Sequence, residues 1–314
     1  MFYEPSTVEQ LAKQIVKISN ISEDKLAYVE KDIWLTYLLR HIYSFDNALD
    51  ELAFKGGTCL VKCHYGYYRF SEDLDFTWTG GKKQSKKLNR RAFESKYVKP
   101  LVEGFGLGFE ETSEIKRGAR HSHSGKVLNY FFTLPIVEQR VQLPKVKINI
   151  SFDETIVFPL DKVKIQPFYV PFENKRELIG YFGKAAEDYF AEFSIPVYSK
   201  EEIACEKIRA LLTRREKINR SRDVVDLFYL SKDVDLAKVV LLPKCRYSKI
   251  TRALAIPAYG KIFKERVQNI DEYLDNIVEY AKHEPVYLKE VDYAEISKFA
   301  KTVLKPVIQS IFQK

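Results

Sequence analysis

Apolar residues recur at helical spacing near the start of the chain. Residues 6–9 form a capping box, a Ser followed three positions later by Glu, and apolar residues follow at Leu11 and Ile15. This pattern predicts a helix that ends near Ser19. Between residues 22 and 42 apolar positions again recur every three or four residues, which predicts a second helix.

Shorter segments with strand character follow. Residues 52–54 are apolar and lead into a glycine turn, and residues 73–78 alternate polar with apolar side chains, as a half-buried strand does. Four later segments are rich in β-branched and aromatic residues and are separated by prolines, a composition typical of antiparallel sheet. These segments are residues 127–134, 141–152, 155–158 and 163–170.

The last third of the chain has helical periodicity almost throughout. The predicted helices cover residues 201–217, 223–231, 259–282 and 291–312, and an earlier charged helix covers residues 82–102. The order of these elements predicts an α+β fold. We expect a domain with a mixed or antiparallel sheet over residues 1–195 and a helical domain over residues 196–314.

Composition indicates a folded protein inside a cell. The chain has 314 residues, of which 46% are hydrophobic and 30% charged. No stretch approaches the roughly 18 uninterrupted apolar residues of a membrane span, and the first residues lack the pattern of a secretory signal. The four cysteines are sparse and unevenly spaced, which suits a reducing compartment. We therefore expect a cytoplasmic protein that does not contact a membrane.

A glycine turn followed by two aspartates is the most informative part of the sequence. Residues 55–58 read Lys-Gly-Gly-Thr, and a glycine pair between a strand and a helix lets a phosphate approach the backbone N–H groups. Asp73 and Asp75 lie two positions apart on a predicted strand, so their side chains point to the same face. Like charges this close are stabilised by a shared cation, and Mg²⁺ prefers carboxylate and phosphate oxygens.

Each half of this pattern also has an ordinary explanation. A Gly-Gly-Thr sequence is a common turn, and an Asp-x-Asp pair is often the solvated end of a strand. Their combination on a predicted strand, turn, helix and strand favours a metal-dependent site for a nucleoside triphosphate.

A second charged cluster lies in the helical part of the chain. Lys207 and Arg214 are seven residues apart, so a helix would place them near one another. They either form a solvated basic face or bind a triphosphate, the lysine as a point charge and the arginine through paired hydrogen bonds. Asp223 and Asp226 would order these cations or add to the acidic site.

Several of these segments resemble one family. Residues 55–60 and 69–76, together with residues 30–36, 206–210 and 222–227, resemble the motifs of the AbiEii-type nucleotidyltransferases. These proteins are the toxin halves of abortive-infection toxin–antitoxin pairs, and they are related to the MenT toxins within the DNA polymerase β-like superfamily. The resemblance covers about residues 28–230.

The resemblance implies a role for individual residues. The residues implied to bind the NTP are Lys55, Gly56, Gly57, Thr58, Arg69 and Arg214. Asp73 and Asp75 would bind Mg²⁺ or Mn²⁺. The residues implied in catalysis are Asp73, Asp75, Lys207, Asp226 and, with a weaker claim, Asp223.

The sequence departs from the superfamily pattern at one position. Enzymes of this superfamily place a third carboxylate on a later strand, where this chain has Asn149. The amide oxygen of Asn can bind a metal ion, but an amide does not act as a general base. Asp153 and Glu154 are the nearest substitutes.

The resemblance implies transfer of a nucleoside monophosphate from an NTP to a hydroxyl of RNA, with the 3′ end of tRNA as one candidate. Growth inhibition and a cognate antitoxin encoded nearby are also implied. The alternative is a module that binds a nucleotide or RNA and has lost catalysis. The amide of Asn149 in place of a third carboxylate would explain the loss of catalysis.

The distribution of charge supports an anionic partner. The chain carries 51 Lys and Arg against 43 Asp and Glu, a net charge of +8. Residues 82–91 and residues 207–222 each carry +6, so the rest of the chain has a net charge of −4. The positive charge therefore lies in two segments, which is compatible with binding a phosphodiester backbone.

Overall fold

The computed structural model describes most of the chain. The described residues are 3–80, 91–105, 108–109, 127–136, 145–152, 154–213, 221–242, 265–288 and 291–311. The chain divides into two compact units, the first made of residues 1–154 and 160–197 and the second of residues 155–159 and 198–314. Each unit is described by itself.

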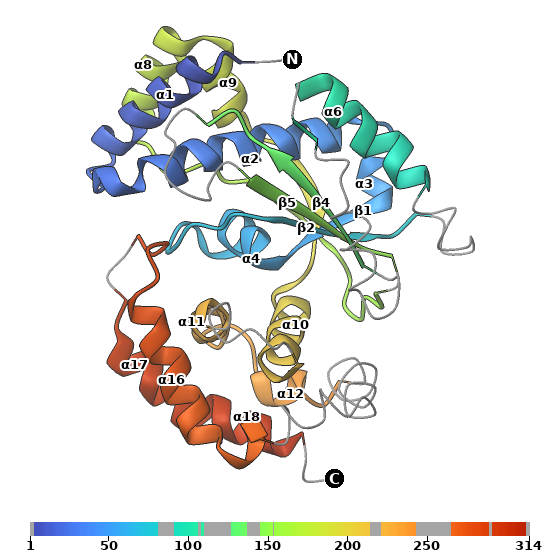
Figure 1. Cartoon of the computed structure of the whole chain (residues 1–314), viewed down its shortest axis with the longest axis vertical. Coiled ribbons are helices and arrows are strands. Elements are labelled where there is room, and N and C mark those ends of the chain that lie inside the picture. Colours follow the sequence, from blue (N-terminus) through green and yellow to red (C-terminus); the bar gives the residue numbers. More distant parts are fainter. Residues whose placement is uncertain are drawn as a thin grey trace. The chain divides into compact units, whose positions relative to one another are not determined.

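A mixed sheet forms the centre of the first unit (Figure 1). The strands in the described part are β1 Leu52–Lys55, β2 Leu74–Trp78, β3 Gly108–Phe109, β4 Val127–Thr133, β5 Lys145–Ser151, β6 Asp161–Lys164 and β7 Ser194–Val197. They are ordered β3-β4-β5-β2-β1-β7-β6. The pairs β2–β5 and β1–β7 are parallel and the other neighbours are antiparallel, so the predicted α+β fold with a mixed sheet is confirmed.

The strands have one apolar and one polar face because their side chains alternate. Leu74 and Phe76 of β2 pair in register with Ile148 and Ile150 of β5, and all four are buried. Helix α2, Leu26–Ser44, covers this apolar face, where the ring centroid of Tyr43 lies 6.2 Å from that of Phe76. The other face of the sheet carries the polar side chains of the same strands.

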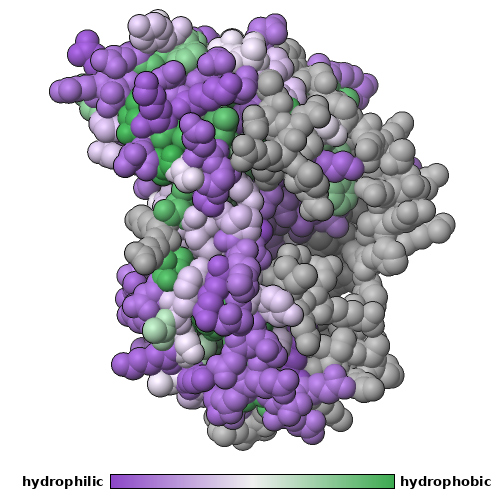
Figure 2. Space-filling model, turned by 60° about the vertical axis from the view of Figure 1, so that its left-hand side comes forward, coloured by the Kyte–Doolittle hydropathy of each residue, from purple (hydrophilic) through white to green (hydrophobic). Residues whose placement is uncertain are grey.

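On the side of the molecule drawn in Figure 2, most of the described surface residues are hydrophilic.

Two helices precede the sheet, as predicted. Helix α1 covers Pro5–Ile18 and buries its apolar side, and a 3₁₀ turn at Glu23–Lys25 leads into α2. The predicted capping box at residues 6–9 does not form, because the helix begins at Pro5 with Glu4 as its N-cap, two residues before the predicted N-cap. Proline suits this position because its fixed φ is already helical and it has no N–H to leave unpaired.

Other helices of the first unit lie around the sheet. They are α3 Ala48–Glu51, α4 Gly56–Cys59 with a π-helical continuation Leu60–Tyr65, a π-helical turn Glu94–Val98 followed by α6 Lys99–Phe105, α8 Phe172–Phe182 and α9 Lys184–Phe190. The sequence did not predict α8 and α9. The predicted strand over residues 163–170 is also wrong over most of its length, since β6 ends at Lys164.

The predicted strand over residues 155–158 is wrong. This segment belongs to the second unit, where the N–H groups of Val157 and Phe158 donate to Oε2 of Glu202 at 3.0 and 3.1 Å. Glu202 is buried, so its carboxylate takes up backbone donors that a strand would have used for a neighbouring strand. The side chain of Glu202 therefore prevents the strand that the sequence of residues 155–158 favours.

The described part of the second unit is helical, as predicted (Figure 1). Its helices are α10 Lys200–Thr213, α11 Ser221–Leu230, α12 Leu236–Val239, α16 Ile270–Lys282, α17 Tyr293–Phe299 with a π-helical continuation Ala300–Leu304, and α18 Lys305–Ser310. The carbonyl of Leu211 near the end of α10 accepts hydrogen bonds from Arg266 and from the Tyr273 hydroxyl at 2.8 and 2.6 Å. Among the described residues, every helix is too short or too polar to span a membrane.

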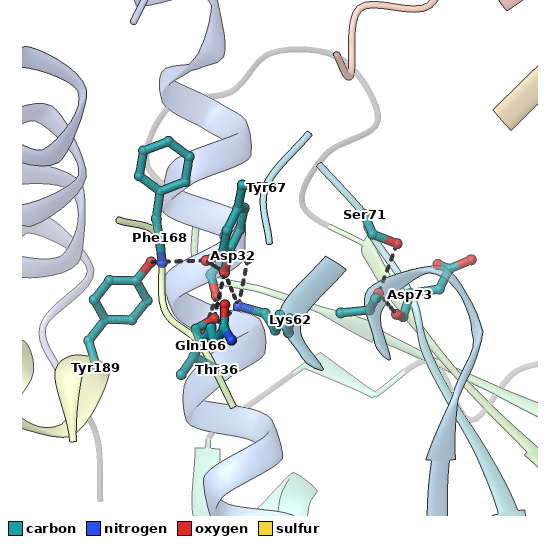
Figure 3. A network of polar contacts seen from close by, with 10 residues as sticks. Asp32, Thr36, Lys62, Tyr67, Ser71, Asp73, Gln166, Phe168 and Tyr189 are labelled. Carbon is teal, nitrogen blue, oxygen red and sulfur yellow. Dashed lines mark hydrogen bonds and ion pairs between the residues drawn. The ribbon is translucent and has the colours of Figure 1, made fainter. Parts of the chain in front are cut away.

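A buried ion pair joins α2 to the helix behind the glycine turn (Figure 3). Lys62 Nζ lies 2.7 Å from Oδ1 of Asp32, and both side chains are almost fully buried. Oδ2 of Asp32 accepts hydrogen bonds from the hydroxyls of Tyr67 and Tyr189, both at 2.9 Å. Lys62 also donates to Thr36 and Tyr67. These contacts connect α2, the helix after the turn, the following loop and α9.

Burial shifts the pKa values of the groups in this network. Burial lowers the pKa of Lys62, and the Asp32 carboxylate opposes this shift. Burial and the nearby Asp32 charge both raise the pKa values of Tyr67 and Tyr189, so these hydroxyls remain protonated donors. In a buried ion pair each charge is stabilised by the opposite charge of its partner, so loss of one partner leaves an uncompensated ion.

We expect Lys62→Met to lower the free energy of unfolding by about 3–5 kcal/mol, because it leaves the Asp32 charge buried without a counter-ion. The double variant Asp32→Asn with Lys62→Met removes both charges and should lose less than the two single variants summed. Urea unfolding measures these differences. Additive losses would contradict direct coupling. The matched control is Lys164→Met, whose exposed pair with Glu192 should contribute less than about 1 kcal/mol.

Candidate active site

The glycine turn brings backbone directly against two charged side chains. Gly56 has a φ of +81°, and a Cβ at this position would lie 2.3 Å from Oδ2 of Asp75 and 3.0 Å from its Cβ. A Cβ at Gly57 would lie 2.6 Å from Nη2 of Arg69. Gly56 is therefore required by its left-handed backbone and by the close approach of Asp75, whereas a Cβ at Gly57 would force the end of the Arg69 side chain to move.

The two aspartates point to the polar face of the sheet. Asp75 lies within β2, and Asp73 immediately precedes this strand. The side chain of Asp73 is 43% exposed, and its Oδ2 lies 2.9 Å from Nζ of Lys147 on β5. Asp75 is half-buried beside Gly56. The sequence prediction that both carboxylates share one face is consistent with this arrangement.

A row of polar residues crosses the sheet through Asp75. The register pairs Lys55 of β1 with Asp75, Asp75 with Asn149 of β5, and Asn149 with Asn129 of β4. Paired residues on neighbouring strands share a face, so these four side chains lie on the face that also carries Asp73. Nζ of Lys55 donates to Oγ of Ser151 at 3.4 Å. The row places Asn149 next to the carboxylate of Asp75 in the register.

Asn149 has an oxygen that the described protein groups do not satisfy. Its Oδ1 is buried, and among the described residues none donates a hydrogen bond to it. An unpaired buried acceptor is costly, and a bound cation or a substrate hydroxyl would satisfy it. Of the two substitutes for a third carboxylate, Glu154 lies three residues beyond the end of β5, and Asp153 lies outside the described residues.

The oxygen donors of this face fit a hard divalent cation. Asp73 and Asp75 contribute carboxylates and Asn149 contributes an amide oxygen, which are ligand types that Mg²⁺ accepts alongside water and phosphate. Among the described residues, no group of three or more His, Cys, Asp or Glu side chains forms a metal site. The donor set is therefore two carboxylates with an amide.

Thr58 and Arg69 are held inside the protein next to the turn. The Thr58 hydroxyl donates to the carbonyl of Asp73 and lies 2.9 Å from Oγ of Ser71, so it fixes the backbone that leads into β2. Nη1 of Arg69 donates to the carbonyl of Phe70 at 2.8 Å, and the residue is 3% exposed. Thr58 and Arg69 therefore stabilise the turn through contacts within the protein.

The second predicted cluster forms within the helical unit. Nζ of Lys207 on α10 lies 2.5 Å from Oδ2 of Asp226 and 3.0 Å from Oδ1 of Asp223, both on α11. Asp226 is fully buried, and Lys207 and Asp223 are nearly so. The structure thus brings these three predicted residues together. Arg214 lies outside the described residues.

Sequence reasoning missed two lysines beside the carboxylates. Lys147 forms an ion pair with Asp73, and buried Lys31 on α2 donates to the carbonyl of Lys145 at 2.8 Å and lies 3.3 Å from Oε2 of Glu72. Alternation along residues 145–151, where Lys145, Lys147, Asn149 and Ser151 are polar, was the available signal for Lys147. Lys31 gave no such signal, because α2 is buried on nearly all sides.

A mixed sheet with a glycine turn against an Asp-x-Asp strand is consistent with a nucleotidyl transferase fold. Residues 37–299 match the family described as nucleotidyl transferase AbiEii toxin of the type IV toxin–antitoxin system. The chain belongs to this family, and it is a nucleotidyl transferase of the toxin class. No curated protein matches the chain.

Alanine substitutions at three glycines test whether Gly56 is required by its backbone conformation alone or also by the close approach of Asp75. Gly183→Ala has only the cost of its unfavourable backbone conformation, about 1–3 kcal/mol, because nothing lies within 4 Å of the added Cβ. Gly56→Ala has this cost and the clash with Asp75, so we expect a larger loss of unfolding free energy and of nucleotide binding. Gly180→Ala meets open space within α8 and should be neutral or stabilising. Equal losses at positions 56 and 183 would contradict the close approach.

Proposed function

We propose that this protein transfers a nucleoside monophosphate from an NTP to an acceptor hydroxyl and releases pyrophosphate, in a reaction that requires Mg²⁺ or Mn²⁺. The observation that carries this proposal is the register of Asp75 and Asn149 beside the glycine turn, with Asp73 on the same face. These residues would hold the cation. A bound divalent ion supplies charge neutralisation at the phosphates and lowers the pKa of the acceptor hydroxyl.

The remaining residues have proposed roles toward the triphosphate. Backbone N–H groups at Gly57 and Thr58 would bind phosphate oxygens, because the turn lies at the start of a helix. Arg69 lies against this turn and would keep its shape or contact the nucleotide. Lys207 would contact a phosphate through its ammonium, which Asp226 and Asp223 hold in place.

We further propose that residues 1–195 form the nucleotidyltransferase domain and that residues 196–314 contribute the basic motifs. RNA is the proposed acceptor, and the 3′ end of tRNA is the first acceptor to test. The charge of +6 in residues 82–91 and again in residues 207–222 supports an anionic macromolecule as substrate. A cognate antitoxin is proposed as the genetic partner, in keeping with the toxin–antitoxin family.

A second candidate is a module that binds a nucleotide or RNA without catalysis. Asn149 favours it, because an amide replaces the acidic group that could accept the proton of the acceptor. Retention of Asp73 and Asp75 against an intact glycine turn supports the catalytic proposal instead. Release of pyrophosphate distinguishes the two.

The test incubates the protein with each labelled NTP, total RNA and Mg²⁺, and measures label transfer and pyrophosphate. We expect transfer with at least one NTP, and a loss of about 10²–10³-fold in Asp75→Asn, the scale expected for a group that stabilises transition-state charge. Asp161→Asn changes an exposed aspartate at the edge of the same sheet and should retain activity. Equal transfer by Asp75→Asn and the wild type would overturn the proposal, and binding without pyrophosphate would favour the second candidate.

A further inference from the structure

Lys147 lies where the proposed cation would approach Asp73. The pairing of Leu74 with Ile148 sets position 73 beside position 147 on neighbouring parallel strands. The ammonium of Lys147 lies 2.9 Å from Oδ2 of Asp73, and the two side chains are 32% and 43% exposed. A cation that binds Asp73 must therefore share this carboxylate with the ammonium or displace it.

The register places one lysine beside each aspartate on this face of β1, β2 and β5, and Lys145 lies further along the same face at the exposed start of β5. Asp73 and Asp75 contribute two negative charges, and Lys55 and Lys147 contribute two positive charges. Lys55 is buried and bonded to Ser151, whereas Lys147 is partly exposed on a long flexible stem. Lys147 is consequently the member of this set that can move away at low cost.

We propose that Lys147 is a counter-cation for Asp73 that weakens binding of a bare divalent cation and favours binding of the cation together with the triphosphate. This inference rests on the proposed function, because it takes Asp73 as a metal ligand. A bare divalent cation competes with the ammonium of Lys147 for the carboxylate of Asp73. A cation that arrives with a triphosphate brings negative charge, which offers the displaced ammonium a new partner. Lys147 is thus a positioning residue that sets metal affinity.

The test measures Mn²⁺ binding to the full chain without nucleotide, by the electron paramagnetic resonance signal of free Mn²⁺. Lys147→Met should bind Mn²⁺ about fivefold more tightly than the wild type, since a partly exposed ion pair contributes up to about that factor. Lys145→Met removes the same charge from the exposed start of β5 and should change the affinity less than about twofold. In Asp73→Asn, the further change Lys147→Met should give no tightening.

Thermal unfolding gives a second readout that does not depend on activity. Without divalent ions Lys147→Met should unfold at a lower temperature than the wild type, because Asp73 and Asp75 then repel each other with one counter-ion fewer. Added Mn²⁺ should raise the midpoint of Lys147→Met by more than that of the wild type.

The outcomes separate the two proposals. Unchanged or weaker Mn²⁺ binding in Lys147→Met, with binding still dependent on Asp73, would overturn the role of Lys147 and leave the proposed function standing. Mn²⁺ binding that is absent from every variant, or that persists unchanged in Asp73→Asn, would overturn the metal site and the counter-cation role together.

Discussion

The geometry of the glycine turn depends on a buried ion pair. The charged groups of Asp32 on α2 and Lys62 on the helix after the turn lie 2.7 Å apart, and both side chains are almost fully buried. Burial of two charges is expensive, so the pair is stable only with its full set of hydrogen bonds, and the tyrosines from two other segments provide them. Because every partner must be in place at once, the pair locks the helix that begins at Gly56 to the apolar side of the sheet.

Because side chains alternate along each strand, one face of the sheet forms the core and the other face carries the candidate site. Apolar residues of β2 and β5 bury themselves under α2, and the polar residues between them are left together on the other face. Asp73, Asp75 and Asn149 are therefore brought together by the same register that builds the core. A slip of one residue would exchange the two faces, so correct core packing and correct assembly of the site require the same register.

The sequence predicted those parts of the protein in which local pattern and tertiary structure agree. The first two helices, β1, β2, the α+β class and the grouping of Lys207 with Asp223 and Asp226 follow from periodicity and motif. The strand predicted at residues 155–158 failed because buried Glu202 takes the backbone donors of that segment. The Asp73–Lys147 ion pair needed the parallel pairing of β2 with β5, which a single sequence does not reveal.

The segment held by Glu202 has a consequence for the modularity of this protein. Residues 155–159 leave the first unit and the chain returns to it at residue 160, before it crosses again after residue 197. The two units are thus joined by three covalent connections. A fragment cut after residue 197 would keep Val157 and Phe158 but lose the carboxylate that binds their N–H groups. Neither unit is therefore a continuous piece of chain, and no single cut separates one unit from the other.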